Sequence, residues 1–132
     1  MSKPLDWQGD VQVFFEDFVA AFRAFDGLLI AQRYVAPYLS LSAEGALTPF
    51  NTREQIGEYF HDIVARYHQE GCRACCFKDL AVTPLGSNSA LASVTWELLR
   101  ADGSLLSFWR ESYNLMCTDD GLKIFASTDH AG

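Results

Sequence analysis

The sequence predicts an α+β fold in which three helices of the N-terminal half pack against a curved antiparallel sheet. Two segments, 10–25 and 53–70, carry apolar residues at the three- and four-residue spacing of a helix buried on one side. From residue 72 onward, strand-like segments alternate with tight turns. Helices and strands are therefore segregated along the chain, which is typical of an α+β protein with an antiparallel sheet.

The first two helices are expected within residues 10–35. The apolar stripe of the first is rich in phenylalanine and comprises Val11, Phe14, Phe15, Phe18, Val19, Phe22 and Phe25. Asp10 is the expected N-cap, because its carboxylate can accept hydrogen bonds from free backbone N–H groups of the first turn. Asp26-Gly27 ends this helix, and Leu28–Val35 is predicted to form a shorter helix that Pro37 stops.

A short hairpin and a third helix follow. Segments 38–42 and 46–50 are the expected hairpin strands, joined by a turn at Glu44-Gly45. Thr52 and Gln55 then form a capping box, in which the Thr52 hydroxyl accepts a hydrogen bond from the Gln55 N–H. Gly71 is expected to end this helix, because glycine readily adopts the positive φ of a helix terminus.

Four strands are expected in the C-terminal half, at 72–83, 91–99, 105–117 and 122–128. Asp102-Gly103 lies between apolar runs, which is a strong signal for a hairpin with a two-residue loop. Such a loop fixes the register of the two flanking strands. It pairs Trp96 with Trp109, Val94 with Glu111, and Ala92 with Tyr113, all on one face of the sheet.

The next turn decides which residues of the last strand share that face. With Asp120-Gly121 as its two central residues, Tyr113 lies opposite Thr128 and Glu111 lies opposite His130. A three-residue turn would shift the last strand by one position and exchange its faces, turning Lys123 inward. We therefore favour the two-residue turn, which brings Glu111 and His130 together near the two indoles.

The composition indicates one folded domain and argues against two classes of partner. The 132 residues are 49% hydrophobic and 14% aromatic, which is enough for one packed core. The net charge is −7 without a cluster of Lys or Arg, so we expect neither a nucleic-acid nor a membrane partner. No secretory segment is recognised at the N-terminus, and no apolar run approaches the ~20 residues of a membrane span, which predicts a cytoplasmic protein.

Four cysteines raise the question of a metal site. Cys72-x-x-Cys75 has the spacing of half a zinc site, but Cys76 and Cys117 do not supply a second pair at a suitable distance. We expect the first three to be small residues in a strand, with free thiols. The sequence predicts no metal site and no cofactor.

The element order, the chain length and four local patterns resemble the nuclear transport factor 2-like superfamily, which includes SnoaL-like polyketide cyclases and ketosteroid isomerases. The patterns are Ala31-Gln-Arg-Tyr34-Val-Ala36, the hairpin around Gly45, Arg53-Glu-Gln-Ile56 and Asp120-Gly121-Leu-Lys-Ile124. The resemblance implies a single SnoaL-like domain over residues 1–132. It also implies a cone-shaped sheet around the helices, an apolar pocket at the open end, and a homodimer formed through the outer sheet face.

The resemblance does not carry over the catalytic residues of ketosteroid isomerases. Their oxyanion-binding Tyr and proton-transferring Asp fall at Phe18 and Ser42, neither of which can take over that role. Phe18 is therefore expected only to line the pocket. Steroid isomerisation by the usual residues of the family is not predicted.

We expect a pocket for a small apolar or aromatic molecule. One hypothesis is a cofactor-free acid–base enzyme (an isomerase, dehydratase or cyclase) with Glu111 and His130 as proton carriers. The other expected pocket residues are Trp96 and Trp109 as its floor, Tyr113, Tyr34 and Tyr59 as oxyanion donors, and Thr128 on the same face. The alternatives are a non-catalytic ligand-binding or dimerising module, and an accessory subunit resembling the small subunit of ring-hydroxylating dioxygenases.

Overall fold

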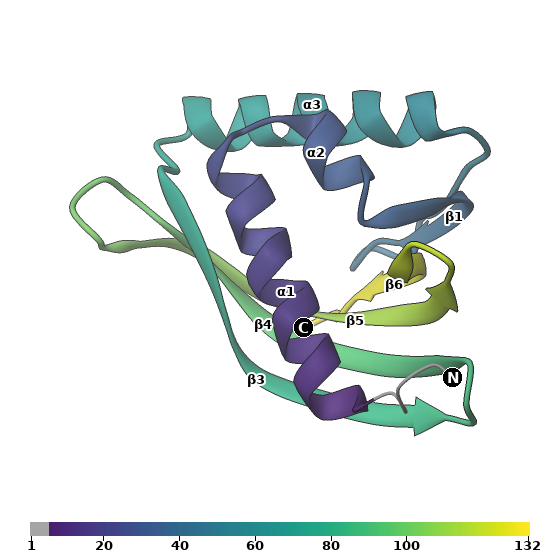
Figure 1. Ribbon diagram of the computed structural model, residues 1–132. Coiled ribbons are helices and arrows are strands. Elements are labelled where there is room, and N and C mark those ends of the chain that lie inside the picture. Colours follow the sequence, from purple (N-terminus) through teal and green to yellow (C-terminus); the bar gives the residue numbers. More distant parts are fainter. Residues whose placement is uncertain (1–5) are drawn as a thin grey trace.

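The computed structural model describes residues 6–132, which form three helices and one curved, six-stranded sheet. The helices are α1 (Trp7–Arg23), α2 (Gly27–Ala31) and α3 (Arg53–Gln69). The strands are β1 (Tyr34–Leu41), β2 (Leu47–Phe50), β3 (Ala74–Leu85), β4 (Ser89–Leu99), β5 (Leu105–Thr118) and β6 (Gly121–Asp129). Helix α1 crosses the concave side of the sheet, and α3 lies across one end of it (Figure 1). The predicted α+β architecture is confirmed.

The strands are arranged in the order β2-β1-β6-β5-β4-β3. The neighbours along the C-terminal half of the chain are antiparallel, as predicted, and so are β1 and β2. The pair β1 and β6 is parallel, with Ser40 beside Ser127, so the sheet is not purely antiparallel. This pairing brings the end of the chain next to its first strand and places β6 in the interior of the sheet.

The first two helices have different bounds from those predicted. Helix α1 begins at Trp7 with Asp6 as its N-cap, and the Asp10 carboxylate accepts a hydrogen bond from the Asp6 N–H at 3.1 Å. Helix α2 ends at Ala31, because Tyr34 already begins β1. The prediction of a helix up to residue 35 was wrong because the apolar residues at this junction have helical spacing although they lie in two elements.

Helix α3 forms as its capping residues predict. The Thr52 hydroxyl accepts from the Gln55 N–H at 3.2 Å, and the Gln55 side chain accepts from the Asn51 N–H at 2.7 Å. Gly71 follows the helix with a φ of 104°, a value that side chains with a Cβ rarely adopt. None of the helices formed by residues 6–132 is long and apolar enough to cross a membrane.

The core lies between α1 and the concave face of β3, β4 and β5. Phe15 is completely buried there, and its ring packs against Trp96 and Tyr113, with centroids 6.0 and 5.3 Å away. Burying an aromatic side chain of this size contributes on the order of 2 to 3 kcal/mol to the free energy of unfolding. The predicted phenylalanine stripe of α1 therefore positions the central strands of the sheet.

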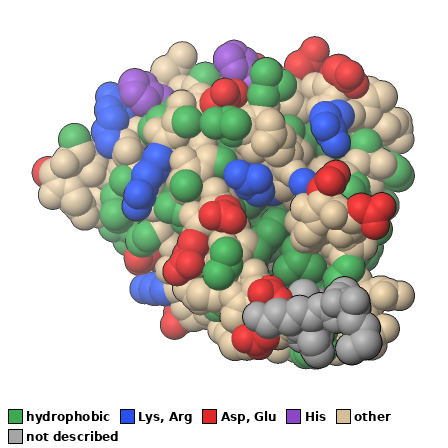
Figure 2. Space-filling model, viewed as in Figure 1, with side chains coloured by type: hydrophobic (Ala, Val, Ile, Leu, Met, Phe, Trp, Pro, Cys, Tyr) green, Lys and Arg blue, Asp and Glu red, His purple; other side chains and the backbone are tan. Residues whose placement is uncertain are grey.

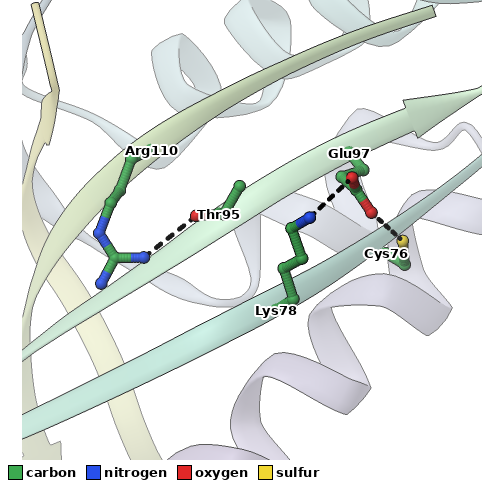
Figure 3. Close-up of polar contacts among 5 residues, drawn as sticks. All are labelled: Cys76, Lys78, Thr95, Glu97 and Arg110. Carbon is green, nitrogen blue, oxygen red and sulfur yellow. Dashed lines mark hydrogen bonds and ion pairs between the residues drawn. The ribbon is translucent and has the colours of Figure 1, made fainter. Parts of the chain in front are cut away.

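The outer face of the same strands is polar at its centre. Lys78 of β3 and Glu97 of β4 form an ion pair at 3.2 Å, and Arg110 of β5 donates to the Thr95 hydroxyl at 3.1 Å (Figure 3). The Cys76 thiol also contacts Glu97, at 3.6 Å. On the face of the molecule shown in Figure 2, acidic and basic side chains are interspersed with hydrophobic ones.

Candidate functional site

A cavity of about 100 Å³ opens between the concave face of the sheet and helices α1, α2 and α3. Ten of its eighteen lining residues are aromatic. The aromatic residues are Phe18, Phe22, Tyr34, Tyr38, Tyr59, Phe60, Tyr67, Trp96, Trp109 and Tyr113. Two carboxyl groups, from Glu111 and Asp129, complete the polar part of the wall with Ser40. The lining is thus an aromatic enclosure with a pair of acids on one side.

Most of the predicted pocket residues lie at this cavity. Trp96, Trp109, Tyr113, Tyr34, Tyr59 and Phe18 all line it, and so does Glu111. Thr128 does not line it, because its side chain is exposed and its strand position lies opposite Ser112. Ser42 is also outside the cavity, in the β1–β2 hairpin, where its hydroxyl accepts from the Ala46 N–H at 3.0 Å.

The predicted register of β4 and β5 is confirmed, although the turn between them differs. Trp96 pairs with Trp109, Val94 with Glu111, and Ala92 with Tyr113. The loop has three residues instead of two, because the Arg100 N–H bonds to the Ser104 carbonyl oxygen at 2.9 Å. A register shift between Leu98 and Leu99 compensates for the extra loop residue and restores the predicted pairing.

The predicted register of the last strand was wrong. Thr118 pairs with Gly121, so Asp119 and Asp120 are the central turn residues. A second shift, between Asn114 and Leu115, then leaves Phe125 as an extra residue in β6. Beyond this bulge the faces of β6 are exchanged, and Glu111 lies opposite Asp129.

His130 consequently does not meet Glu111. Its Nε2 lies 2.7 Å from the Ser112 hydroxyl, and its backbone N–H bonds to the Arg110 carbonyl oxygen at 2.9 Å. Ser112 alternates with Glu111 along β5 and therefore faces the other side of the sheet. The residue that shares the cavity wall with Glu111 is Asp129.

Glu111 is held in its buried position by aromatic hydrogen-bond donors. The Trp109 indole N–H donates to Glu111 Oε1 at 2.9 Å, and the Trp96 indole N–H donates to the Tyr113 hydroxyl at 2.7 Å. Tyr113 also acts on the Glu111 carboxyl and lowers its pKa, against the larger effect of burial. One indole thus orients the Glu111 carboxyl, and the other orients the Tyr113 hydroxyl.

Burial and the neighbouring acid change the protonation of this pair. The 9% exposed Glu111 has a pKa raised to about 8, first because burial disfavours its charged form and second because Asp129 is negative. Burial also raises the pKa of the half-buried Asp129, which a hydrogen bond with Glu111 opposes. At neutral pH Glu111 is therefore largely protonated, and the neighbouring Asp129 carboxyl can share this proton.

Sequence reasoning missed several lining residues. Asp129 was not predicted to line the cavity because the face on which it lies depends on the bulge at Phe125, and phenylalanine is not a residue type that indicates a bulge. Tyr38 and Tyr67 were recognised as strand and helix residues but not assigned to the pocket, which both of them line. Tyr38 lies four positions from Tyr34 along β1, so the even spacing was a usable sign that both side chains share the inner face.

Two of the four cysteines are packed in the interior, whereas Cys76 is partly buried and Cys117 is exposed. Cys72 and Cys75 are buried, and Cys75 reaches the cavity wall. Burial raises the pKa of the Cys75 thiol to about 12, so at neutral pH this thiol is protonated and a poor nucleophile.

Several solved structures share this fold. An NTF2-like protein with a cystatin-like fold from Novosphingobium aromaticivorans matches with a TM-score of 0.75 and 14% identity, over 96% of this chain and 82% of that chain. A proposed dehydratase of the NTF2-like family from Streptomyces avermitilis matches with a TM-score of 0.70 and 16% identity, over 94% of each chain. A proposed aromatic ring hydroxylase, also from N. aromaticivorans, matches with a TM-score of 0.72 and 18% identity, over 98% of this chain and 92% of that chain.

At these identities the likeness demonstrates the fold alone. No curated protein has a sequence that matches this chain. A family model described as NTF2-like protein (DUF6841) matches residues 8–132, which is almost the whole chain. With the curved six-stranded sheet and its helices, this match shows that the chain belongs to the NTF2-like protein (DUF6841) family.

Proposed function

We propose that this protein binds a small, mostly apolar or aromatic molecule and acts on it as a cofactor-free acid–base enzyme, of the isomerase, dehydratase or cyclase type. The observation that carries the proposal is the Glu111–Asp129 pair on the wall of an aromatic cavity. It replaces the Glu111–His130 pair expected from the sequence.

A carboxyl pair that shares one proton offers both an acid and a base at neutral pH. The protonated Glu111 can deliver a proton to a substrate oxygen, and the ionised Asp129 can take one from a carbon next to a carbonyl group. The Tyr34 hydroxyl also lines the cavity and can stabilise negative charge that develops on that oxygen. Burial raises the pKa of Tyr34 well above its ordinary value, so this hydroxyl is a neutral hydrogen-bond donor.

The surroundings of the pair support a catalytic role. The aromatic lining packs against flat apolar groups and excludes water, which strengthens electrostatic interactions in the cavity. A structural relative is described as a proposed dehydratase, which is one of the reaction types considered. A merely structural carboxyl would be expected at the surface, because ionisable groups are rarely buried without a partner or a function.

Proton exchange tests the proposal without knowledge of the natural substrate. A panel of aryl ketones and cyclic enones is incubated with the protein in D₂O, and loss of the proton signals next to the carbonyl is followed by NMR. We expect exchange of at least one panel member to be accelerated. Glu111→Gln and Asp129→Asn should each reduce the acceleration by about 10² to 10⁴, the contribution of a positioned acid or base.

Two residues of the outer face provide matched controls. Glu97→Gln removes a carboxylate from the neighbouring strand, and His130→Gln removes the imidazole next to the true partner of Glu111. Glu97→Gln should retain the full exchange rate, and His130→Gln, whose imidazole acts on Asp129 from outside the cavity, should retain most of it. Equal exchange by the wild type and by folded Glu111→Gln, or loss of exchange in the two controls, would refute the assignment.

A second candidate is a non-catalytic module or an accessory subunit, for which the outer sheet face is relevant. Phe108 of β5 lies on that face and is 65% exposed, and Leu105 at the start of the strand is 43% exposed. We propose that this surface pairs with a second copy of the chain. Light scattering during size-exclusion chromatography should then give the mass of two chains, and the mass of one chain across the micromolar range would exclude the pairing.

A further inference from the structure

The charge of the cavity wall is one-sided. Within the described part of the chain, the lining includes the acids Glu111 and Asp129 but no Lys, Arg or His. Arg66 of α3 is exposed and lies over the Tyr67 ring, 5.8 Å from its centroid, without joining the lining. Because acids are the only ionisable groups of opposite sign to a cation in this lining and no basic side chain of residues 6–132 balances them there, the cavity disfavours anions and favours a positive charge.

The rings of the lining favour the same kind of ligand. Tyr38, Tyr59, Tyr67 and Trp109 come from β1, α3 and β5 and surround the space next to the acid pair. The face of an aromatic ring is electronegative and attracts an ammonium group, most strongly where water is excluded. An aromatic enclosure closed by a carboxylate is therefore complementary to an organic cation.

The Tyr34 hydroxyl is a further polar group of the cavity that a ligand can use. The residue is 2% exposed and lines the cavity. Its hydroxyl has no hydrogen-bond partner among residues 6–132, whereas the neighbouring Tyr38 hydroxyl bonds to Ser127 at 2.5 Å. Because Tyr34 lines the cavity, its hydroxyl can form a hydrogen bond with a polar group of a ligand.

We propose that the ligand of this cavity carries an organic ammonium group, held by the aromatic rings and by the Glu111–Asp129 pair. The inference rests on the proposed function in that the same cavity is the binding site, and it adds the charge of the molecule that enters. At about 100 Å³ the cavity fits a small head group, since pockets for drug-sized ligands occupy roughly 300 to 1,000 Å³.

Cation binding should be coupled to proton release. The titratable groups that face Glu111 are one acid and five tyrosines: Asp129 of β6, Tyr113 of β5, Tyr34 and Tyr38 of β1, and Tyr59 and Tyr67 of α3. Helix α1 contributes only apolar side chains to the cavity wall. More remote charges are Arg66, which acts on Tyr59 and Tyr67, and Glu44 and His130, which act on Asp129. Because the tyrosines stay neutral, the titration near pH 8 is that of the acid pair.

The sign of the pH dependence distinguishes this ligand from a neutral one. A cation favours the doubly ionised pair, so its affinity should rise with pH, by at most tenfold per pH unit for one released proton, and level off above the pKa of about 8. A neutral ligand that accepts a proton from Glu111 should instead bind more weakly as the pH rises.

Three probes of similar shape test the proposal by isothermal titration calorimetry between pH 6 and 9. Choline carries the cation, 3,3-dimethyl-1-butanol is its neutral carbon analogue, and 3,3-dimethylbutanoate is an anionic analogue. Tetramethylammonium serves as a smaller cation. We expect a cation to bind about tenfold or more tightly than the neutral analogue at pH 8.5, and the anion to bind most weakly.

Variants separate the carboxyl from the rings. Glu111→Gln, checked for folding by circular dichroism, should weaken cation binding about tenfold and flatten its pH dependence, while binding of the alcohol stays unchanged. Tyr59→Leu should weaken cation binding several-fold, and Tyr59→Phe, which keeps the ring face, should not.

Every outcome of these experiments supports or refutes one of the two proposals. If both cations bind no better than the alcohol, or if cation binding falls with rising pH, the ammonium proposal is wrong; Glu111-dependent proton exchange in D₂O would still support the acid–base function. If the cations bind as expected but exchange is the same in Glu111→Gln, the ammonium site stands and the catalytic proposal fails.

Discussion

The two faces of β5 reverse the usual partition of residues between protein interior and surface. On the concave face Glu111 is 9% exposed, whereas on the outer face Phe108 is 65% exposed. The same strand thus buries a carboxyl and exposes a large aromatic ring. Both residues depart from the usual distribution, because ionisable side chains are seldom buried and large apolar side chains are seldom so exposed.

The neighbours of these two residues show how the two faces of β5 differ. On the concave face Glu111 accepts a hydrogen bond from an indole and has a second acid beside it, so specific partners surround the buried carboxyl. The outer face presents Phe108 beside residues that form ordinary polar contacts, such as Arg110 with Thr95. We propose that the concave face forms the binding and catalytic site and that the outer face contacts water or another chain.

The strongest test of this contrast compares two phenylalanines. Phe15→Ala, which opens a cavity against the concave face, should lower the free energy of unfolding by about 3 to 5 kcal/mol. Phe108→Ala should change it by less than about 0.5 kcal/mol in the monomer, because the side chain is already in water. Urea unfolding at low protein concentration measures both values. A comparable loss in the two variants would show that the outer face also packs against the body of the protein.

The second test uses pH to examine the buried carboxyl. An acid whose pKa is raised on folding stabilises the protein below its unfolded-state pKa, and this stability is lost as the pH rises through the folded-state pKa. For Glu111 the loss runs from about pH 4.5 to about pH 8, at ~1.4 kcal/mol per unit, on the order of 3 to 5 kcal/mol in total. Glu111→Gln should therefore be more stable than the wild type at pH 8, by about 2 to 4 kcal/mol.

The measurement is chemical unfolding of both proteins at pH 5, 6.5 and 8. At pH 5 the two should differ little, because Glu111 is protonated in the folded wild type and the amide keeps most of its hydrogen bonds. The stability curve of Glu111→Gln should be flatter, with Asp129 accounting for what pH dependence remains. If the free energies of unfolding of the two proteins changed with pH in parallel, Glu111 would titrate normally and water would reach its carboxyl on the concave face.

Periodicity and turn residues were enough to predict the elements and most of the cavity. The phenylalanine stripe of α1, the Thr52–Gln55 cap and the pairing of Trp96 with Trp109 all depend on local rules, and the structure confirms them. The pairing was correct even though the loop had one residue more than predicted. Packing of the two indoles on the inner face selects that register, so a bulge absorbs the extra residue.

The acid partner of Glu111 could not be predicted in the same way. Its identity depends on a single extra residue, Phe125, which exchanges the faces of β6 midway along the strand. Nothing local marks this bulge; β6 is also paired with β1, whose own register shifts between Tyr34 and Leu39. The bulge lies in a strand that pairs with β5 on one side and with β1, from the other end of the chain, on the other side. Its position is therefore determined by tertiary packing, which the sequence of β6 alone does not reveal.

The smallest expected effect comes from the carboxylate on the outer face. Glu97 of β4 pairs with Lys78 at 3.2 Å, and their side chains are 24% and 55% exposed. Because both groups remain in contact with water, Glu97→Gln should lower the free energy of unfolding by no more than about 1 kcal/mol, and the loss should shrink in 1 M salt. Unfolding at low and high salt, with Lys78→Met as the matched partner variant, measures it. A loss of several kcal/mol that salt does not change would mean that Glu97, like Glu111, is held in a dry environment, and the contrast between the two faces would no longer hold.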